Sequence, residues 1–154
     1  MLTRFEPQMA EIKMVYPFTT AIAGAFLIIL QQLLMMNTGT HRAKAKIGVG
    51  LNDDRELERK VRRHGNLAEN AALFLVILAL VEGFTGGGIA VTSFATIFVL
   101  ARISHAVGFM SLSGSHADGS EFTPFVFFRM VGAMGTGLTG IALGLYLAYL
   151  LATL

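Results

Sequence analysis

Polar and charged side chains recur at helical intervals within a largely hydrophobic sequence. From position 55 onward the intervals are three or four residues, and the side chains concerned are Arg55, Arg59, Arg62, Asn66 and Glu69. At about 100° per residue, this spacing places all five on one narrow face of a helix. Guanidinium groups bind carboxylates with bidentate geometry, so this face is suited to an anionic ligand.

A second polar set occurs further along the chain. Arg102, His105 and Phe109 have the same three-and-four spacing, and Arg129 follows near the start of the last apolar segment. If the segments alternate in direction, these side chains reach the same end of a bundle as Glu69. A charge at membrane depth costs several kcal/mol unless it is paired or hydrated, so we expect the two sets to form one functional layer.

The balance of charge in this layer leaves two interpretations open. Glu69 is the one acid expected to be buried there, because Glu58 lies outside the helix face that carries the arginines and is nearer to solvent. Four arginines face it, namely Arg59, Arg62, Arg102 and Arg129. An excess of buried cations predicts an anionic ligand. Alternatively, Glu69 neutralises Arg102 or Arg129, which would give a bundle with internal ion pairs and no ligand.

The elements that must position these residues are helices across a membrane. Hydrophobic residues make up 54% of the 154-residue chain and charged residues only 14%, against roughly 25% charged residues in soluble domains. A membrane-spanning helix needs about 20 mainly apolar residues, and four segments meet this requirement: 15–36, 56–81, 89–110 and 125–152. Backbone groups in lipid must be satisfied within each segment. The sequence therefore predicts an all-α integral membrane four-helix bundle, with residues 1–154 as a single domain.

The connecting segments indicate how the helices end and how they are oriented. Residues 38–54 form a predicted polar loop, residues 83–88 a glycine-rich turn, and residues 111–123 a polar stretch before Pro124, which suits the first turn of a helix. Lys and Arg concentrate in the first loop and at the start of the second helix, whereas the opposite side offers only Arg4 and Lys13. By the positive-inside rule, the loop and the candidate site face the cytoplasm and both termini lie outside.

Several functional classes are disfavoured by what the sequence lacks. It has no cysteine, which excludes disulfides, thiolate nucleophiles and cysteine-bound metals, so any thiol chemistry needs a thiol from a substrate. The four histidines show no metal-binding helical spacing, and no serine has the partners of a hydrolase triad. Without a basic patch and stacking aromatic residues, nucleic acid is not expected as a partner. The first apolar run is too long for a signal peptide and is expected to be retained.

Small residues follow one another at four-residue spacing in the last segment: Gly132, Thr136, Gly140 and Gly144. Small side chains let helix backbones approach closely within a membrane. The stripe therefore predicts helix packing, which we expect to occur between subunits.

Three stretches carry a resemblance to a known family. Residues 58–69 resemble the second-helix signature of the MAPEG family, the membrane-associated proteins in eicosanoid and glutathione metabolism. Residues 101–109 are similar to the family's third helix, particularly in its bacterial members, and residues 128–132 to the start of its fourth. The resemblance covers most of the chain and implies four-helix subunits that assemble as a homotrimer, with glutathione bound between neighbouring subunits near the cytoplasmic face.

The resemblance also implies roles for individual residues. Arg62, Asn66 and Glu69 would hold the backbone, carboxylates and amine of glutathione, with Arg59 on the same face. Arg102 and His105 would extend the pocket. Arg129 would stabilise the glutathione thiolate as the catalytic residue. Glutathione is then a co-substrate, and no metal is implied.

The function implied is that of a glutathione-dependent transferase or peroxidase in a bacterial inner membrane, surrounded by membrane lipids. Its second substrate would be a lipophilic electrophile or a lipid hydroperoxide. The alternative is a non-catalytic member that binds glutathione or lipid, or an accessory subunit of a membrane complex. A small drug-type transporter is less favoured, because such a carrier needs a buried acid without a cationic ring.

The chain departs from the family pattern at a few positions. Asn70 and Ala72 stand where members commonly have Tyr and Pro, and Phe109 stands where several catalytic members have Tyr. Without those hydroxyls, activation of the thiol rests mainly on Arg129. The family's basic residue at the end of the first helix has no clean match, and the residues nearby are Asn37, His41 and Arg42.

Overall fold

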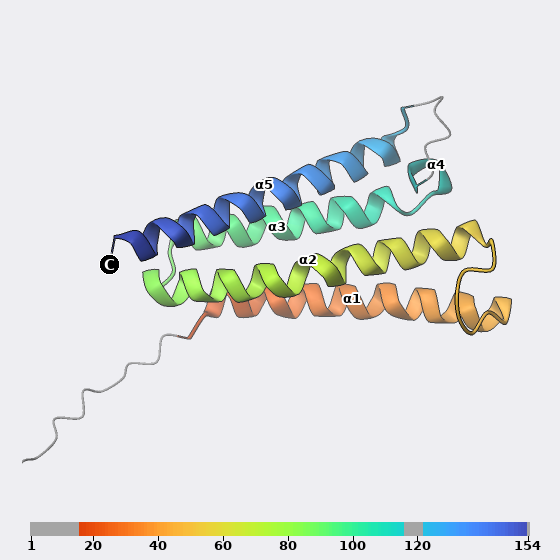
Figure 1. Cartoon of the computed structure of the whole chain (residues 1–154), viewed down its shortest axis with the longest axis horizontal. Coiled ribbons are helices and arrows are strands. Elements are labelled where there is room, and N and C mark those ends of the chain that lie inside the picture. The colour runs from red at the N-terminus through yellow and green to blue at the C-terminus, as the bar shows by residue number, and fades with distance from the viewer. Residues whose placement is uncertain (1–15, 116–121, 154) are drawn as a thin grey trace, which may run out of the picture.

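Four long helices lie side by side in the computed structural model, which describes residues 16–115 and 122–153 (Figure 1). The described elements are α1 (Phe18–Ala45), α2 (Arg55–Thr85), α3 (Ile89–Gly108), the short α4 (Leu112–Ser115) and α5 (Pro124–Ala152). Each of the four long helices is apolar and long enough to cross a membrane. The predicted all-α membrane bundle is thus confirmed. The predictions for Arg4 and Lys13, and the part of the histidine prediction that concerns His116, lie outside the described residues.

The first connection is shorter than predicted. Helix α1 continues to Ala45, so the predicted loop over residues 38–54 is wrong for its first eight positions. The isolated Gly39 does not end the helix, and Arg42 and Lys44 in the last turn complement the negative end of the helix dipole. The helix ends where Lys46 adopts a left-handed conformation with φ of 56°. Helix α2 likewise runs on to Thr85 and ends at the left-handed Gly86.

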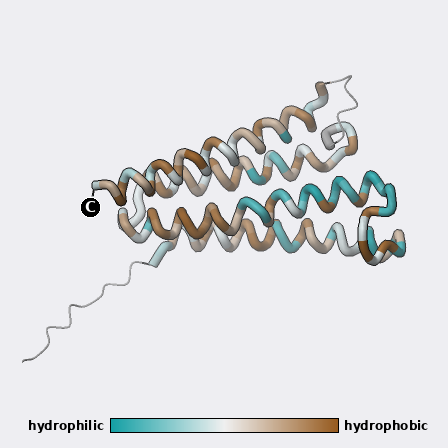
Figure 2. The backbone as a smooth tube through the Cα atoms, viewed as in Figure 1, coloured by the Kyte–Doolittle hydropathy of each residue, from teal (hydrophilic) through white to brown (hydrophobic). Residues whose placement is uncertain are grey.

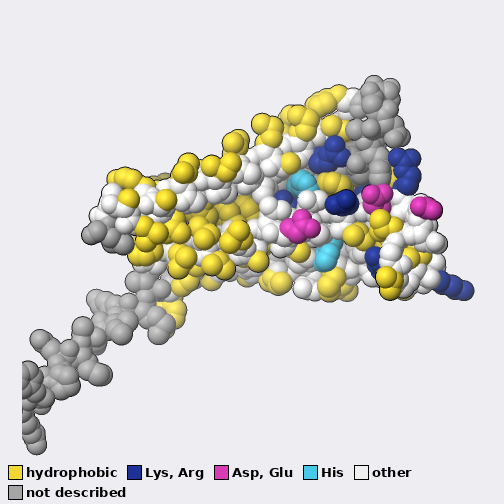
Figure 3. All heavy atoms as spheres, viewed as in Figure 1, with side chains coloured by type: hydrophobic (Ala, Val, Ile, Leu, Met, Phe, Trp, Pro, Cys, Tyr) yellow, Lys and Arg dark blue, Asp and Glu magenta, His cyan; other side chains and the backbone are white. Residues whose placement is uncertain are grey.

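The first two helices are longer than a bilayer is thick. At 1.5 Å per residue, α1 and α2 are about 42 and 46 Å long, whereas the hydrocarbon core is about 30 Å thick. The excess lies at the end that carries the α1–α2 loop, where α2 is hydrophilic (Figure 2). Charged side chains gather at that end and hydrophobic ones cover the rest of the visible face (Figure 3). This end of the molecule therefore projects from the apolar layer.

Two capped helix starts define the polar end. The Asp54 side chain accepts a hydrogen bond from the backbone N–H of Leu57 (2.9 Å) and so caps α2. Thr123 caps α5 in the same way, accepting from Val126 N (3.3 Å), and Pro124 occupies the first turn as predicted.

A buried acid at the opposite end joins α1 to α2. Glu82 is only 3% exposed, and its carboxylate accepts bonds from Thr19 N (2.8 Å), Thr20 N (2.8 Å) and Thr20 Oγ1 (2.7 Å). The first N–H groups of a helix have no partner within it, and the cap residue Pro17 makes no side-chain bond. Glu82 therefore caps α1 from a neighbouring helix. It was not among the predicted acids, because a single Glu before Gly83 is also what a turn would contain.

Helices α3 and α5 approach each other closely through glycine. A Cβ added at Gly108 would lie 2.5 Å from the backbone N of Arg129, and one added at Gly132 would lie 2.6 Å from the Cα of His105. Gly132 and Thr136 are both buried within the chain. The prediction that they pack between subunits is therefore wrong: they pack against α3 of the same chain.

Candidate functional site

An open polar groove lies where the end of α1, the following loop and the first half of α2 meet. It has a volume of about 290 Å³, and it is lined by Arg42, Gly50, Leu51, Glu58, Val61, Arg62, Gly65, Asn66 and Glu69. We call it the polar groove. The structure thus brings together three predicted site residues, Arg62, Asn66 and Glu69. They share one side of α2 because they are three or four residues apart.

Two acids of the polar groove differ from their predicted positions. Glu58 lines the groove, although it was expected to fall off the face. Glu69 is exposed in the single chain, not buried, since no described helix covers its side of α2. The groove therefore carries two acids together with Arg42 and Arg62, and a mixed lining of this kind suits a ligand with both signs of charge.

The contribution of α1 to the groove is Arg42. Its Nη1 donates to the carbonyl of Gly50 at 2.8 Å, which holds the loop against the helix end. Asn37 accepts from Arg63 Nη2 (3.4 Å), and His41 has other partners. Of the three candidates near the end of the first helix, Arg42 is the one in the groove lining.

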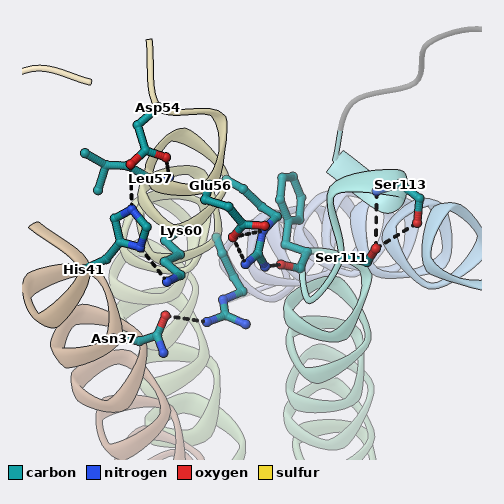
Figure 4. Close-up of polar contacts among 11 residues, drawn as sticks. Asn37, His41, Asp54, Glu56, Leu57, Lys60, Ser111 and Ser113 are labelled. Carbon is teal, nitrogen blue, oxygen red and sulfur yellow. Dashed lines mark hydrogen bonds and ion pairs between the residues drawn. The ribbon is translucent and has the colours of Figure 1, made fainter. Parts of the chain in front are cut away.

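A chain of hydrogen bonds fixes α1 to the start of α2 (Figure 4). Lys60 Nζ donates to His41 Nδ1 (2.9 Å), and His41 Nε2 donates to Asp54 Oδ2 (2.7 Å). The bond from His41 is the main reason that the pKa of the Asp54 carboxyl is below its ordinary value. Because Asp54 also caps α2, these contacts set the position of the loop beside the polar groove.

Arg59 lies apart from the polar groove. Its side chain is buried, and its Nη2 is 2.5 Å from Glu56 Oε2. Its Nη1 donates to the carbonyl of Phe109, just beyond the end of α3. The guanidinium therefore joins α2 to α3 through one of the carbonyls that a helix end leaves unpaired. Figure 4 shows the bonds at Glu56.

Arg102 and His105 lie buried between α3 and α5. Arg102 Nη1 donates to Thr136 Oγ1 (3.2 Å), and its Nη2 is 3.5 Å from His105 Nδ1. Within the described part of the chain, Arg102 Nε has no hydrogen-bond partner. Among the described residues its hydrogen-bond partners are Thr136 and His105, and no ion pair with Glu69 is seen there, so the alternative in which Glu69 neutralises Arg102 is not supported.

Arg129 lies beside the end of α3. Its guanidinium carbon is 5.8 Å from the centre of the Phe109 ring, a cation–π contact, and the Phe109 ring is 4.9 Å from that of His105. We refer to Arg102, His105, Phe109 and Arg129 as the α3–α5 cluster. None of these four is among the described side chains that line the polar groove. The two predicted polar sets therefore form separate clusters within one chain.

Metal ligands do not gather at either cluster. Among residues 16–115 and 122–153, no group of three or more His, Cys, Asp or Glu side chains could hold a metal ion.

Comparison with known proteins identifies a family. Residues 20–149 match the family model described as MAPEG family, which covers all four membrane-spanning helices almost completely. Comparison with curated proteins and with solved structures found no match.

Proposed function

The chain belongs to the MAPEG family, and from this membership we propose that it is a membrane-bound glutathione-dependent transferase or peroxidase. Its second substrate is a lipophilic electrophile or a lipid hydroperoxide that enters from the bilayer. The observation that carries this proposal is the polar groove, in which two arginines and two glutamates line one hollow at the polar end of the bundle.

The groove fits glutathione in the sign and placement of its charges. Glutathione has two carboxylates and one ammonium group, and it supplies the thiol that this cysteine-free chain lacks. Arg42 and Arg62 are suited to the carboxylates, and Glu58 or Glu69 to the ammonium group. Asn66 Nδ2 donates to the carbonyl of Arg62 (2.8 Å), so its carbonyl oxygen is directed away from the helix backbone and can accept a peptide N–H.

Arg129 is the residue we propose for activation of the thiol. An arginine beside a thiol lowers its pKa, and the thiolate is the nucleophile. Because Arg129 is not in the polar groove of its own chain, we infer that a neighbouring copy brings its α3–α5 cluster to the groove in a homotrimer. Arg102 and His105 would then extend the pocket, and Arg59 would support it from behind.

The trimer gives a direct test of this inference. Native mass spectrometry of the detergent-purified protein is expected to show three copies per particle. A stable monomer that binds glutathione with full affinity and activates its thiol would contradict it, because the two clusters are separate within one chain.

Replacing Glu69 by Gln is expected to weaken glutathione binding about ten- to hundredfold. A hydrogen bond to a charged group contributes about 1.5–3 kcal/mol, and the substitution removes the charge while keeping the shape. Calorimetry of the purified protein with glutathione measures the change. Asp53→Asn, at an exposed loop position outside the groove lining, is the matched control and is expected to bind as the wild type does. Equal affinities for both variants would exclude Glu69 from the site.

Phe109 favours a second candidate, a member that binds glutathione without turning it over. The ring offers no hydroxyl to a thiol, and it contacts Arg129 instead. In that case calorimetry would show binding while the bound thiol gives no thiolate absorbance at neutral pH. Absence of binding would leave the role of a lipid-binding or accessory subunit.

A further inference from the structure

A groove between α1 and α3 lies far from the polar groove. Both helices begin at the end of the bundle opposite the α1–α2 loop (Figure 1), and the groove follows their first halves. Its lining runs from Phe18 to Phe26 on α1 and from Thr92 to Leu100 on α3, and its volume is about 490 Å³. Every described side chain in this lining is uncharged. We call it the α1–α3 groove.

The α1–α3 groove opens towards the bilayer. Ile22, Phe26 and Leu100 at its rim are 57%, 46% and 60% exposed. Its floor contains the buried Ala23 and Ala95, whose small side chains let the groove reach far in between the two helices. Since α1 and α3 are both long and apolar enough to cross a membrane, the groove is continuous with the surface that these spans present to lipid.

The dimensions of the groove match one acyl chain in one leaflet. Its lining on each helix spans about 12 Å at 1.5 Å per residue, and one leaflet contributes about half of the 30 Å hydrocarbon core. A group of the size of water takes about 30 Å³, so the groove has room for about 16 such groups. A methylene group is similar in size. The volume therefore corresponds to a single long hydrocarbon chain.

Bulky side chains at the rim disfavour a helix as the occupant. Helices in membranes approach each other through small residues, as α3 and α5 do at Gly108 and Gly132. The α1–α3 groove instead has Phe26 and Leu100 at its rim, and these would keep a helix about 10 Å wide away from the alanine floor. A flexible hydrocarbon chain can pass between them and reach the floor.

An occupant of this kind would complete the packing of α1. At this end α1 is bonded to α2 through Glu82, whereas the groove separates it from α3. Atoms that line an unfilled space lose the dispersion contacts that a neighbour would provide. A chain seated in the groove would restore these contacts on both helices.

We propose that the α1–α3 groove binds one acyl chain of a membrane glycerolipid as a structural lipid, in the leaflet opposite the polar groove. The described lining has no charged side chain that could bind a headgroup, so the site recognises the chain and not the headgroup. It is separate from the polar groove and does not depend on the proposed glutathione-dependent function.

Tryptophan fluorescence tests this assignment, because the chain contains no tryptophan of its own. Phe26→Trp places a reporter in the groove. Phe84→Trp is the matched control, since Phe84 is similarly exposed (50% against 46%) and lies outside the lining. The probe is phosphatidylcholine with a dibrominated stearoyl chain, added to delipidated protein in detergent. Quenching of Phe26→Trp is expected to saturate at about one lipid per copy of the chain, with little quenching of Phe84→Trp at that ratio.

Competition with unbrominated lipids shows what the groove recognises. Dipalmitoylphosphatidylethanolamine and dipalmitoylphosphatidylglycerol differ in headgroup charge and are expected to relieve the quenching equally. Dioctanoylphosphatidylglycerol is expected to be weaker by about tenfold or more, because its shorter chains leave part of the groove without contacts. If the two headgroups differ more than the two chain lengths do, the groove does not recognise the chain and the proposal fails.

A variant that fills the groove locates the lipid there. Thr96→Phe, made together with Phe26→Trp, is expected to abolish the saturable quenching. Ser93→Phe is its control, since Ser93 is another exposed hydroxyl residue of α3 and lies outside the lining. Quenching that persists in Thr96→Phe, or that is lost equally in Ser93→Phe, overturns the site.

Native mass spectrometry of Thr96→Phe tests the other occupant, a neighbouring copy of the chain. A change in the number of copies per particle would assign the groove to that copy and overturn the lipid assignment. The competition series needs only the reporter variant, so it decides the question even if Thr96→Phe folds poorly.

Discussion

Replacing Arg129 by Leu is expected to lower glutathione-dependent turnover at pH 7 by about twentyfold or more. A free cysteine-type thiol has a pKa near 8.5, so only about 3% is ionised at pH 7, whereas a thiol lowered by about two units is about three quarters ionised. Loss of the guanidinium removes that advantage. Arg129 contacts the Phe109 ring rather than the described lining of the polar groove, so we expect glutathione affinity to change much less than the rate.

The thiolate absorbance of bound glutathione, titrated against pH, measures this effect directly. As the pH is raised, the absorbance of the wild type is expected to increase with a midpoint below pH 7. In Arg129→Leu the midpoint should lie near pH 8.5. Arg129→Lys keeps the charge and the contact with the Phe109 ring, and it should recover part of the shift. If Arg129→Leu titrates as the wild type does, Arg129 has no role in activating the thiol.

Replacing Gly132 by Ala is expected to destabilise the protein strongly. The added methyl carbon would lie 2.6 Å from both Cα and Cβ of His105, and a backbone atom cannot move aside without its helix. Overpacking of this kind costs about 1–3 kcal/mol and sometimes more. The separation of α3 from α5 would also draw Phe109 away from Arg129, the residue proposed to activate the thiol, so the variant should lose thiol activation together with stability.

A glycine on the same helix provides the control. Gly137 has open space around it, and Gly137→Ala is expected to be neutral or to stabilise the helix by up to about 1 kcal/mol, because alanine is the better helix former. Thermal unfolding followed by circular dichroism in one detergent compares the two. Because the changes are chemically identical, a midpoint for Gly132→Ala as high as that of Gly137→Ala would show that α3 and α5 are not held together at this glycine.

The spans and part of the site could be predicted from the sequence because they depend on local periodicity. Uninterrupted apolar runs define the helices, and three-and-four spacing places Arg62, Asn66 and Glu69 together. The same spacing failed for Arg59. A helical period gives the direction of Cβ, whereas the guanidinium lies several bonds further out and is drawn to Glu56 and to the Phe109 carbonyl.

Features that depend on contacts between helices could not be predicted in this way. Glu82 caps α1 across 62 positions of sequence, and nothing near it in the chain indicates this partner. The separation of Arg102 and Arg129 from the polar groove also follows from how pairs of helices pack. Gly132 and Gly140 belong to one stripe in the sequence, yet one contacts a helix and the other borders an open groove.

The extra length of α1 and α2 has a consequence for how two substrates would meet. These helices exceed the hydrocarbon thickness by about 12 to 16 Å, and the polar groove lies toward the hydrophilic end of α2, beside the α1–α2 loop. In the proposed function, a water-soluble peptide and a bilayer-soluble electrophile each stay in the medium that dissolves them and meet where the two media adjoin. The protein then resembles a phase-transfer catalyst. The electrophile concentration it experiences is set by partition into the membrane, so sparingly soluble compounds would be its best substrates.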